Sequence, residues 1–183
     1  MRFPKLIAGI FLGFLVCSAN AQQVENTSYT TASGEKVLKL EMVVPINRMA
    51  AWDYFTKDDL LKKWIAPLAH IDLKTGGFIL TNYDKEKSLE DSSSIRLVII
   101  NYLEGELLTL KVKLNDNFPK SVQNEDGNLQ ELIQFKDEGN GKTRIISSMI
   151  GWGNGDDWNK TYNLFVKGNT WTYEELYKAI QAK

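Results

Sequence analysis

The chain has 183 residues, of which 43% are hydrophobic, 11% aromatic and 25% charged, so its composition is that of a globular protein of about one domain. Its formal net charge of -1 lacks the strong positive balance typical of nucleic-acid binding, and we expect no nucleic acid among its partners. One Cys and one His leave little room for a zinc cluster, a disulfide framework or a Cys–His nucleophile pair, so we expect no metal and no cofactor.

Residues 1–21 have the features of a secretory signal peptide. Arg2 and Lys5 precede an apolar run over 6–17, and the segment ends in Ala19-Asn20-Ala21, which matches an A-x-A cleavage site. The run is shorter than the ~20 residues that span a bilayer, so we expect no stable membrane insertion after cleavage. The sequence therefore predicts an exported protein, periplasmic or secreted, cleaved after Ala21. Losing these 21 of 183 residues leaves 162, and losing both basic residues changes the net charge from -1 to -3.

The polar residues 22–35 predict a flexible lead-in to a single domain over 36–183. Residues 36–45 alternate between apolar and polar, which predicts a half-buried strand. Asn47 can cap a short helix, and a second helical turn follows up to Trp64 and stops at Pro67.

Six more segments are predicted to be strands, and glycine-containing turns between several of them indicate antiparallel pairing. They cover residues 70–74, 78–83, 95–103, 107–114, 129–136 and 143–152. Residues 115–128 form a longer surface loop, a candidate lid. Residues 154–182 carry one broad apolar stripe at helical spacing. The predicted class is α+β: a curved antiparallel sheet of about six to seven strands wraps a long C-terminal helix, with two short helices after the first strand.

The short-helix region also carries a family resemblance. Residues 49–67 (MAAWDYFTKDDLLKKWIAP) and 71–79 (IDLKTGGFI) resemble the activator-of-heat-shock-protein-ATPase homologue branch of the SRPBCC (START-like, birch-pollen-allergen-like) superfamily. The matching positions are Trp52, Phe55, Thr56, Leu60, Trp64, Pro67, Asp72, Gly76 and Gly77. Residues 101–110 and 141–153 resemble later strands of that family, so the resemblance covers about 36–183. It implies the helix-grip fold, with an apolar cavity between the sheet and the last helix.

Glu131 is the sharpest candidate for a polar group in that cavity. Alternation along 129–136 places Glu131 on the inward face with Ile133 and Phe135. A buried carboxylate needs a partner or a raised pKa, and Arg144 on the following strand is the predicted partner. The alternatives are a structural ion pair and an edge position facing water. On the last helix, Trp158, Tyr162 and Phe165 are candidates for the cavity wall, with plain core packing as the alternative.

These residues lead to one principal hypothesis and two alternatives. The principal one is a non-enzymatic protein that binds a small apolar or amphipathic molecule in its sheet–helix cavity. The first alternative is a cyclase- or hydrolase-type enzyme, which would need an acid–base pair made from Glu131 and either His70 or Tyr83. The second is a co-chaperone-like interaction module that uses an exposed apolar surface. No residue is assigned a catalytic role.

Overall fold

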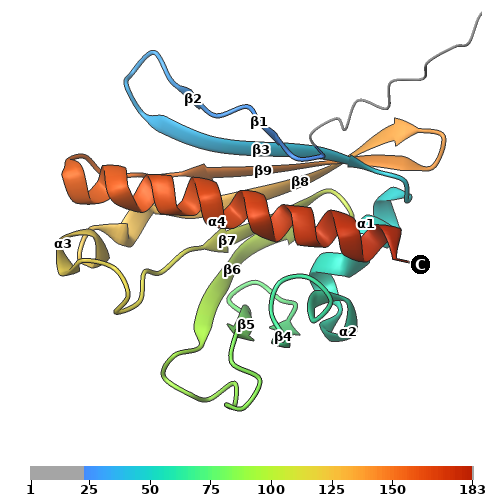
Figure 1. Ribbon diagram of the computed structural model, residues 1–183. Helices are drawn as coiled ribbons and strands as arrows, with labels where there is room; N and C mark the ends of the chain where they lie inside the picture. Colours follow the sequence, from blue (N-terminus) through green and yellow to red (C-terminus); the bar gives the residue numbers. More distant parts are fainter. Residues whose placement is uncertain (1–22, 183) are drawn as a thin grey trace, which may run out of the picture.

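Nine antiparallel strands form one curved sheet in the computed structural model, which describes residues 23–182 (Figure 1). The strands are β1 (Glu25–Asn26), β2 (Tyr29–Thr30), β3 (Lys36–Val44), β4 (Leu68–Asp72), β5 (Phe78–Asn82), β6 (Ile95–Leu103), β7 (Leu107–Lys111), β8 (Gln130–Gly139) and β9 (Lys142–Ile150). Their order across the sheet is β1-β3-β9-β8-β7-β6-β5-β4, and β2 also pairs with β3. The seven longer strands match those predicted, and the two extra strands have two residues each. The predicted signal peptide lies outside the described residues.

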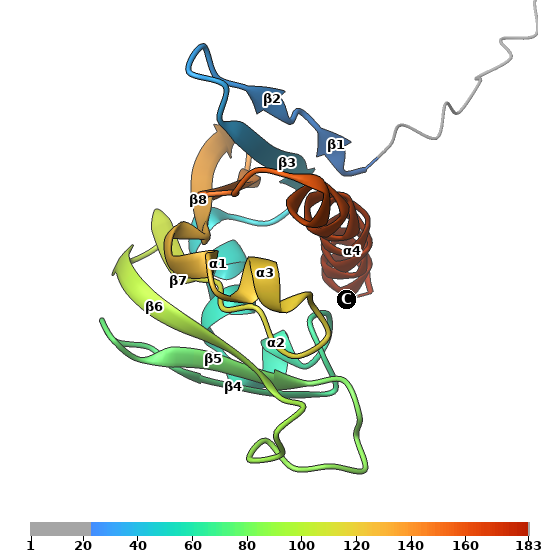
Figure 2. The same ribbon diagram turned by 90° about the vertical axis from the view of Figure 1, so that its left-hand side faces the viewer.

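One long helix occupies the concave side of this sheet. The helices are α1 (Arg48–Thr56), α2 (Asp58–Leu61), α3 (Lys120–Gln123), the 3-10 turn η1 (Asp126–Asn128) and α4 (Asp156–Gln181). Figure 2, which looks roughly along α4, shows the sheet curving around it from β3 to β4. Asn47 caps α1 as predicted, since its side chain accepts a hydrogen bond from the amide of Ala50 at 2.9 Å. The α+β helix-grip prediction is thus confirmed. Within residues 23–182, no helix has both the length and the apolar character needed to cross a membrane.

The segment ahead of β3 differs from the flexible lead-in that its polar composition predicts. Its strands β1 and β2 pair with β3, and the amide of Thr27 donates to the carbonyl of Lys39 at 2.9 Å. Val24 is fully buried. The outer edge of β3 offers unpaired backbone groups, and even a polar segment gains hydrogen bonds by pairing with them.

Aromatic side chains pack both ends of α4 against the rest of the molecule. At its C-terminal half, Tyr173 lies against Phe55 and Trp64, with ring centroids 6.4 and 6.0 Å away. At its N-terminal end, Trp152 contacts Trp158 and Tyr162, with centroids 6.3 and 5.0 Å apart. Neither aromatic cluster fills the space between the middle of α4 and the sheet.

Candidate functional site

A cavity of about 280 Å³ lies between the middle of α4 and the sheet. We call it the α4 cavity. Its wall comes from α1 and α2, from β5 to β9, from the segment after β7 and from residues 164–173 of α4. The lining residues are Phe55, Leu61, Trp64, Ile65, Ile79, Thr81, Tyr83, Ile95, Leu97, Leu110, Val112, Lys113, Leu114, Asn115, Phe118, Glu131, Ile133, Met149, Leu164, Phe165, Gly168, Asn169, Thr172 and Tyr173. Most of this wall is apolar, as in the sites that proteins use for small organic molecules.

Small residues on α4 explain why the space is open at this point. Gly168, Asn169 and Thr172 line the cavity in the middle of α4. Toward its two ends, the helix instead carries aromatic or large aliphatic side chains. A Cβ placed on Gly168 would have no heavy atom within 4 Å. The side chain missing there leaves room at the mouth, where the lining residues Tyr83 and Leu164 are 54% and 59% exposed.

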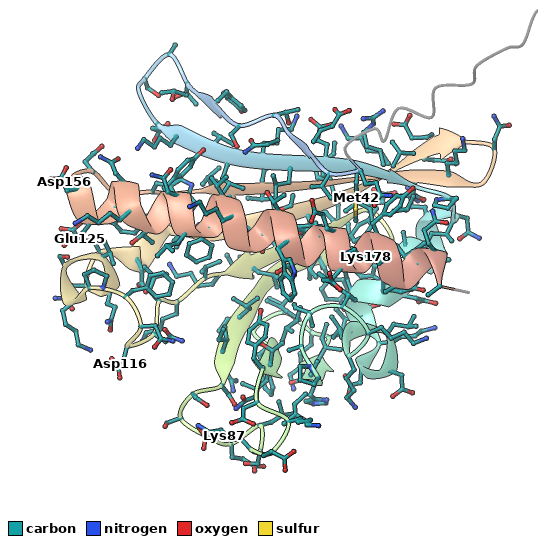
Figure 3. The ribbon with its side chains drawn as sticks, viewed as in Figure 1. Met42, Lys87, Asp116, Glu125, Asp156 and Lys178 are labelled. Carbon is teal, nitrogen blue, oxygen red and sulfur yellow. The ribbon has the colours of Figure 1, made fainter. Side chains whose placement is uncertain are left out.

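The segment between β7 and β8 closes one side of the cavity. Residues 115–128 were predicted to be a surface loop and candidate lid, and 107–114 a strand, but β7 ends at Lys111. The segment that follows holds α3 and η1 as well as lining residues 112–115 and 118. Phe118 stacks on Phe165 of α4 with centroids 5.7 Å apart. The carboxylate of Asp126 accepts from the amide of Leu114 at 2.8 Å, and Trp158 donates to Glu125 at 2.8 Å. Figure 3 shows Glu125 beside the N-terminal end of α4, near Asp156. The Phe118–Phe165 and Glu125–Trp158 contacts fasten the segment to α4, and the Asp126–Leu114 hydrogen bond holds the segment together.

Glu131 brings a carboxyl group into the apolar wall. Its Oε1 accepts a hydrogen bond from Ser147 Oγ of β9 at 2.6 Å and another from the Tyr173 hydroxyl of α4 at 2.9 Å. Burial beneath α4 raises the pKa of Glu131 above its ordinary value, although both hydrogen bonds act in the opposite direction. Burial, and then the charge of Glu131, raise the pKa of Tyr173 well above its ordinary value. The site therefore holds a carboxyl whose ionised form is destabilised and a phenol that stays protonated.

A second polar group lies next to this carboxyl. Met149 pairs with Glu131 across β8 and β9, and its Sδ accepts from Asn169 Nδ2 at 3.1 Å. A thioether is a weak acceptor, so this contact binds the amide only loosely. Asn169 is one turn before Tyr173 on α4, which places its amide on the same side of the cavity as the carboxyl.

The structure places three of the seven predicted site residues on the cavity wall. Glu131, Ile133 and Phe165 line the α4 cavity. Phe135 is buried against Trp52 and Phe55 and is not in the wall. Trp158 and Tyr162 belong to the cluster around Trp152, nearer the N-terminal end of α4 than the cavity. For these three, core packing is the arrangement observed.

The predicted pairing of Glu131 with Arg144 is wrong. Arg144 Nε donates to Glu138 at 2.5 Å, and its Nη1 lies 3.6 Å from Glu41. The register pairs Arg144 with Lys136, whereas Met149 stands opposite Glu131. Since successive strand residues point to opposite faces, Arg144 lies on the convex face and Glu131 on the concave one.

The partners predicted for an acid–base pair do not approach Glu131 either. His70 contacts Asp58 through Nδ1 at 2.7 Å and is absent from the cavity wall. Tyr83 is at the exposed mouth and makes no hydrogen bond to Glu131. Among residues 23–182, no group of three or more His, Cys, Asp or Glu side chains is placed to hold a metal ion.

Sequence reasoning missed four residues of the polar region: Ser147, Met149, Asn169 and Tyr173. For Ser147 and Tyr173, the sequence pattern indicated that the side chain faces the interior. Thr143, Ile145 and Ser147 have the same parity on β9 and are all buried, so strand alternation indicates that Ser147 shares the inward face of the apolar Ile145. Tyr173 belonged to the apolar stripe of the last helix, but its hydroxyl partner depends on the sheet beneath it.

No protein-family model and no curated protein matches this sequence. Solved structures do resemble it. A conserved protein of unknown function from Enterococcus faecalis, EF2215, is 14% identical, with a TM-score of 0.62 over 85% of this chain and 77% of that one. The protein MLL2253 from Mesorhizobium loti is 12% identical, with a TM-score of 0.63 over 80% and 98%. The Aha1 dimer from Colwellia psychrerythraea is 14% identical, with a TM-score of 0.52 over 73% and 92%. At such identities the likeness shows the fold alone, a curved antiparallel sheet around a long C-terminal helix.

Proposed function

We propose that this protein binds a small apolar or amphipathic molecule in the α4 cavity. The observation that carries the proposal is a space of about 280 Å³ whose wall is mostly aliphatic and aromatic, with few polar groups. Water in such a space makes few hydrogen bonds, and an apolar ligand gains roughly 25 cal/mol for each Å² of its surface removed from water. The volume is near the lower end of the range for ligand sites, about 300–1,000 Å³, which favours a small ligand.

Access from solvent supports this function. The mouth lies between the middle of α4, the end of β5 with the segment after it, and the segment after β7. Its exposed members include Leu164 and Tyr83, so an apolar molecule meets apolar surface before it enters. Entry over Gly168 requires no movement of a large side chain at that position.

Gly168 offers a test that leaves the fold undisturbed. We expect the variant Gly168→Trp to bind the neutral apolar dye N-phenyl-1-naphthylamine much more weakly than the unchanged protein, because the indole would occupy the mouth. The matched control Gly168→Ala also replaces the glycine, a poor helix former, but adds only a methyl group, so it should bind the dye normally. Dye fluorescence measures both. Absence of binding by the unchanged protein, or equal binding by both variants, would contradict the proposal.

The branch assignment and the export of the protein complete the proposal. The short-helix motif, together with the likeness to the Aha1 dimer, supports the activator-homologue branch. Within the motif, a Cβ on Gly77 would lie 2.0 Å from the carbonyl oxygen of Asp72, so the turn between β4 and β5 requires glycine there. For export, N-terminal sequencing of the protein outside the cytoplasm should begin at Gln22, and a chain that still begins at Met1 would refute cleavage.

A further inference from the structure

The hydrogen bonds of Glu131 leave one of its oxygens free for a ligand. Ser147 and Tyr173 both donate to Oε1, at 2.6 and 2.9 Å. No donor from residues 23–182 reaches Oε2, although an ionised carboxylate has about four acceptor positions. Among the described residues no fully buried side-chain oxygen or nitrogen lacks a hydrogen-bond partner, so the unpartnered Oε2 is accessible, and Glu131 lines the α4 cavity.

Among the described residues that line the cavity, none places a positive charge inside it to balance this carboxyl. The other charged residue of the wall, Lys113, is exposed. Arg144, the predicted partner, is engaged by Glu138 and Glu41 on the convex face. Glu131 is partly buried among apolar side chains, where an ionised carboxyl without a cationic partner is costly, and a bound cation would offset that cost.

The surroundings of the carboxyl also suit a cation with an apolar body. The wall contains the aromatic rings of Phe55, Trp64, Phe165 and Tyr173, whose faces attract positive charge. Asn169 adds an amide carbonyl that makes no hydrogen bond with the described residues, beside an amide nitrogen held only by a thioether. An ammonium group has three donors and no acceptor, which matches one free carboxylate oxygen and one free amide oxygen.

We infer that the ligand of the α4 cavity is a small amphipathic amine, whose protonated nitrogen donates to Glu131 Oε2 and Asn169 Oδ1 while its apolar part fills the space toward the mouth. This inference depends on the proposed function and names its ligand class. A neutral alcohol of the same length would make one weaker contact with the carboxyl. A carboxylic acid would place a second negative charge beside Glu131.

Three probes with one chain length test the head group: octylamine, octanol and octanoate, each displacing N-phenyl-1-naphthylamine at pH 7.5. A hydrogen bond between charged groups adds about 1.5–3 kcal/mol, so octylamine should bind about ten- to a hundredfold more tightly than octanol, and octanoate most weakly. Glu131→Gln should abolish the preference for the amine. Glu138→Gln removes the same charge from the convex face of the same strand and should keep the preference.

A folding control and a second variant accompany Glu131→Gln. Glutamine at 131 still offers an oxygen to Ser147 and Tyr173, and circular dichroism will confirm folding. Should that variant fail to fold, Asn169→Leu, at a helical position, should lower the preference for octylamine several-fold. Equal binding of octylamine and octanol, or a preference that survives both substitutions, would overturn the amine inference while leaving the cavity function intact. Failure of all three probes and the dye to bind would instead refute the proposed function.

Discussion

The two ends of α4 and its middle serve different purposes in the same helix. At the ends, Trp158 is 3% exposed and Leu176 is fully buried. In the middle, Gly168, Asn169 and Thr172 face the α4 cavity. The helix is continuous from Asp156 to Gln181 despite the glycine, so the difference lies in side-chain volume and not in a break of the backbone.

This contrast shows how a helix-grip protein can combine a stable core with an empty space. The aromatic clusters at the ends fix the distance between α4 and the sheet. The residues between them are too small to fill the space at that distance. Changes in the aromatic clusters should therefore lower stability, even where a ring such as Phe55 also borders the cavity, whereas changes at the small residues in the middle should alter binding. Substitutions at both places test this difference between the ends and the middle of α4.

The largest loss of stability is expected from Phe55→Ala. Phe55 is 1% exposed, and its ring lies 4.9 Å from that of Trp64 and 5.1 Å from that of Phe135. Removing such a ring should lower the free energy of unfolding by about 3–5 kcal/mol, measured by urea denaturation. Leu164→Ala, at the exposed rim of the cavity, should change it by no more than about 0.5 kcal/mol. Similar losses in both variants would contradict this difference.

Gly153→Ala tests the N-terminal end. A Cβ at this position would lie 2.1 Å from Nε1 of Trp158, which is buried and donates to Glu125. The indole must move, and overpacking of this kind costs about 1–3 kcal/mol. Thermal unfolding measures the change, and an unaltered melting temperature would show that the end is not tightly packed.

The pH dependence of stability tests the buried carboxyl. Because burial raises the pKa of Glu131 in the folded state, its protonated form favours folding. That contribution is complete below the unfolded value near 4.5 and is lost as pH rises through the folded pKa. Glu131→Gln should remove this loss, so the stability of the variant relative to the unchanged protein should increase between pH 4 and pH 8.

Other groups titrate in the same experiment without affecting the comparison. The pKa values of Glu41, Asp58 and Glu138 are lowered, which gives the opposite pH dependence, but both proteins share them. Tyr173 titrates well above this range. Curves of stability against pH that run parallel for the two proteins would show that the carboxyl is not destabilised when ionised.

Gly168→Ala should give a small effect of the opposite sign. Alanine is favoured over glycine inside a helix by about 0.5–1 kcal/mol, and the added Cβ has no heavy atom within 4 Å. We expect a small gain in the free energy of unfolding. A loss would indicate that the middle of α4 is packed, contrary to the account given above.

Local alternation in the sequence predicted most of the sheet and the extent of α4, because each strand and helix face repeats within a few residues. The same rule could have placed Arg144 correctly: it alternates with Thr143 and Ile145, which are buried. The position of the cavity was not predictable in this way. It depends on sheet curvature and on where residues 112–118 border the space beside α4, both set by contacts distant in sequence. Trp158 and Tyr162 were consequently predicted as wall residues although they pack the core.

The most direct test of the cavity as a binding site uses the methionine methyl groups. Met149 lines the α4 cavity, whereas Met42 is buried in the core on β3 and Met49 is exposed on α1 (Figure 3 labels Met42). In protein with 13C-labelled methionine methyls, titration with N-phenyl-1-naphthylamine should shift the Met149 signal and leave those of Met42 and Met49 in place. An unchanged Met149 signal, or equal shifts of all three, would contradict binding beneath the middle of α4.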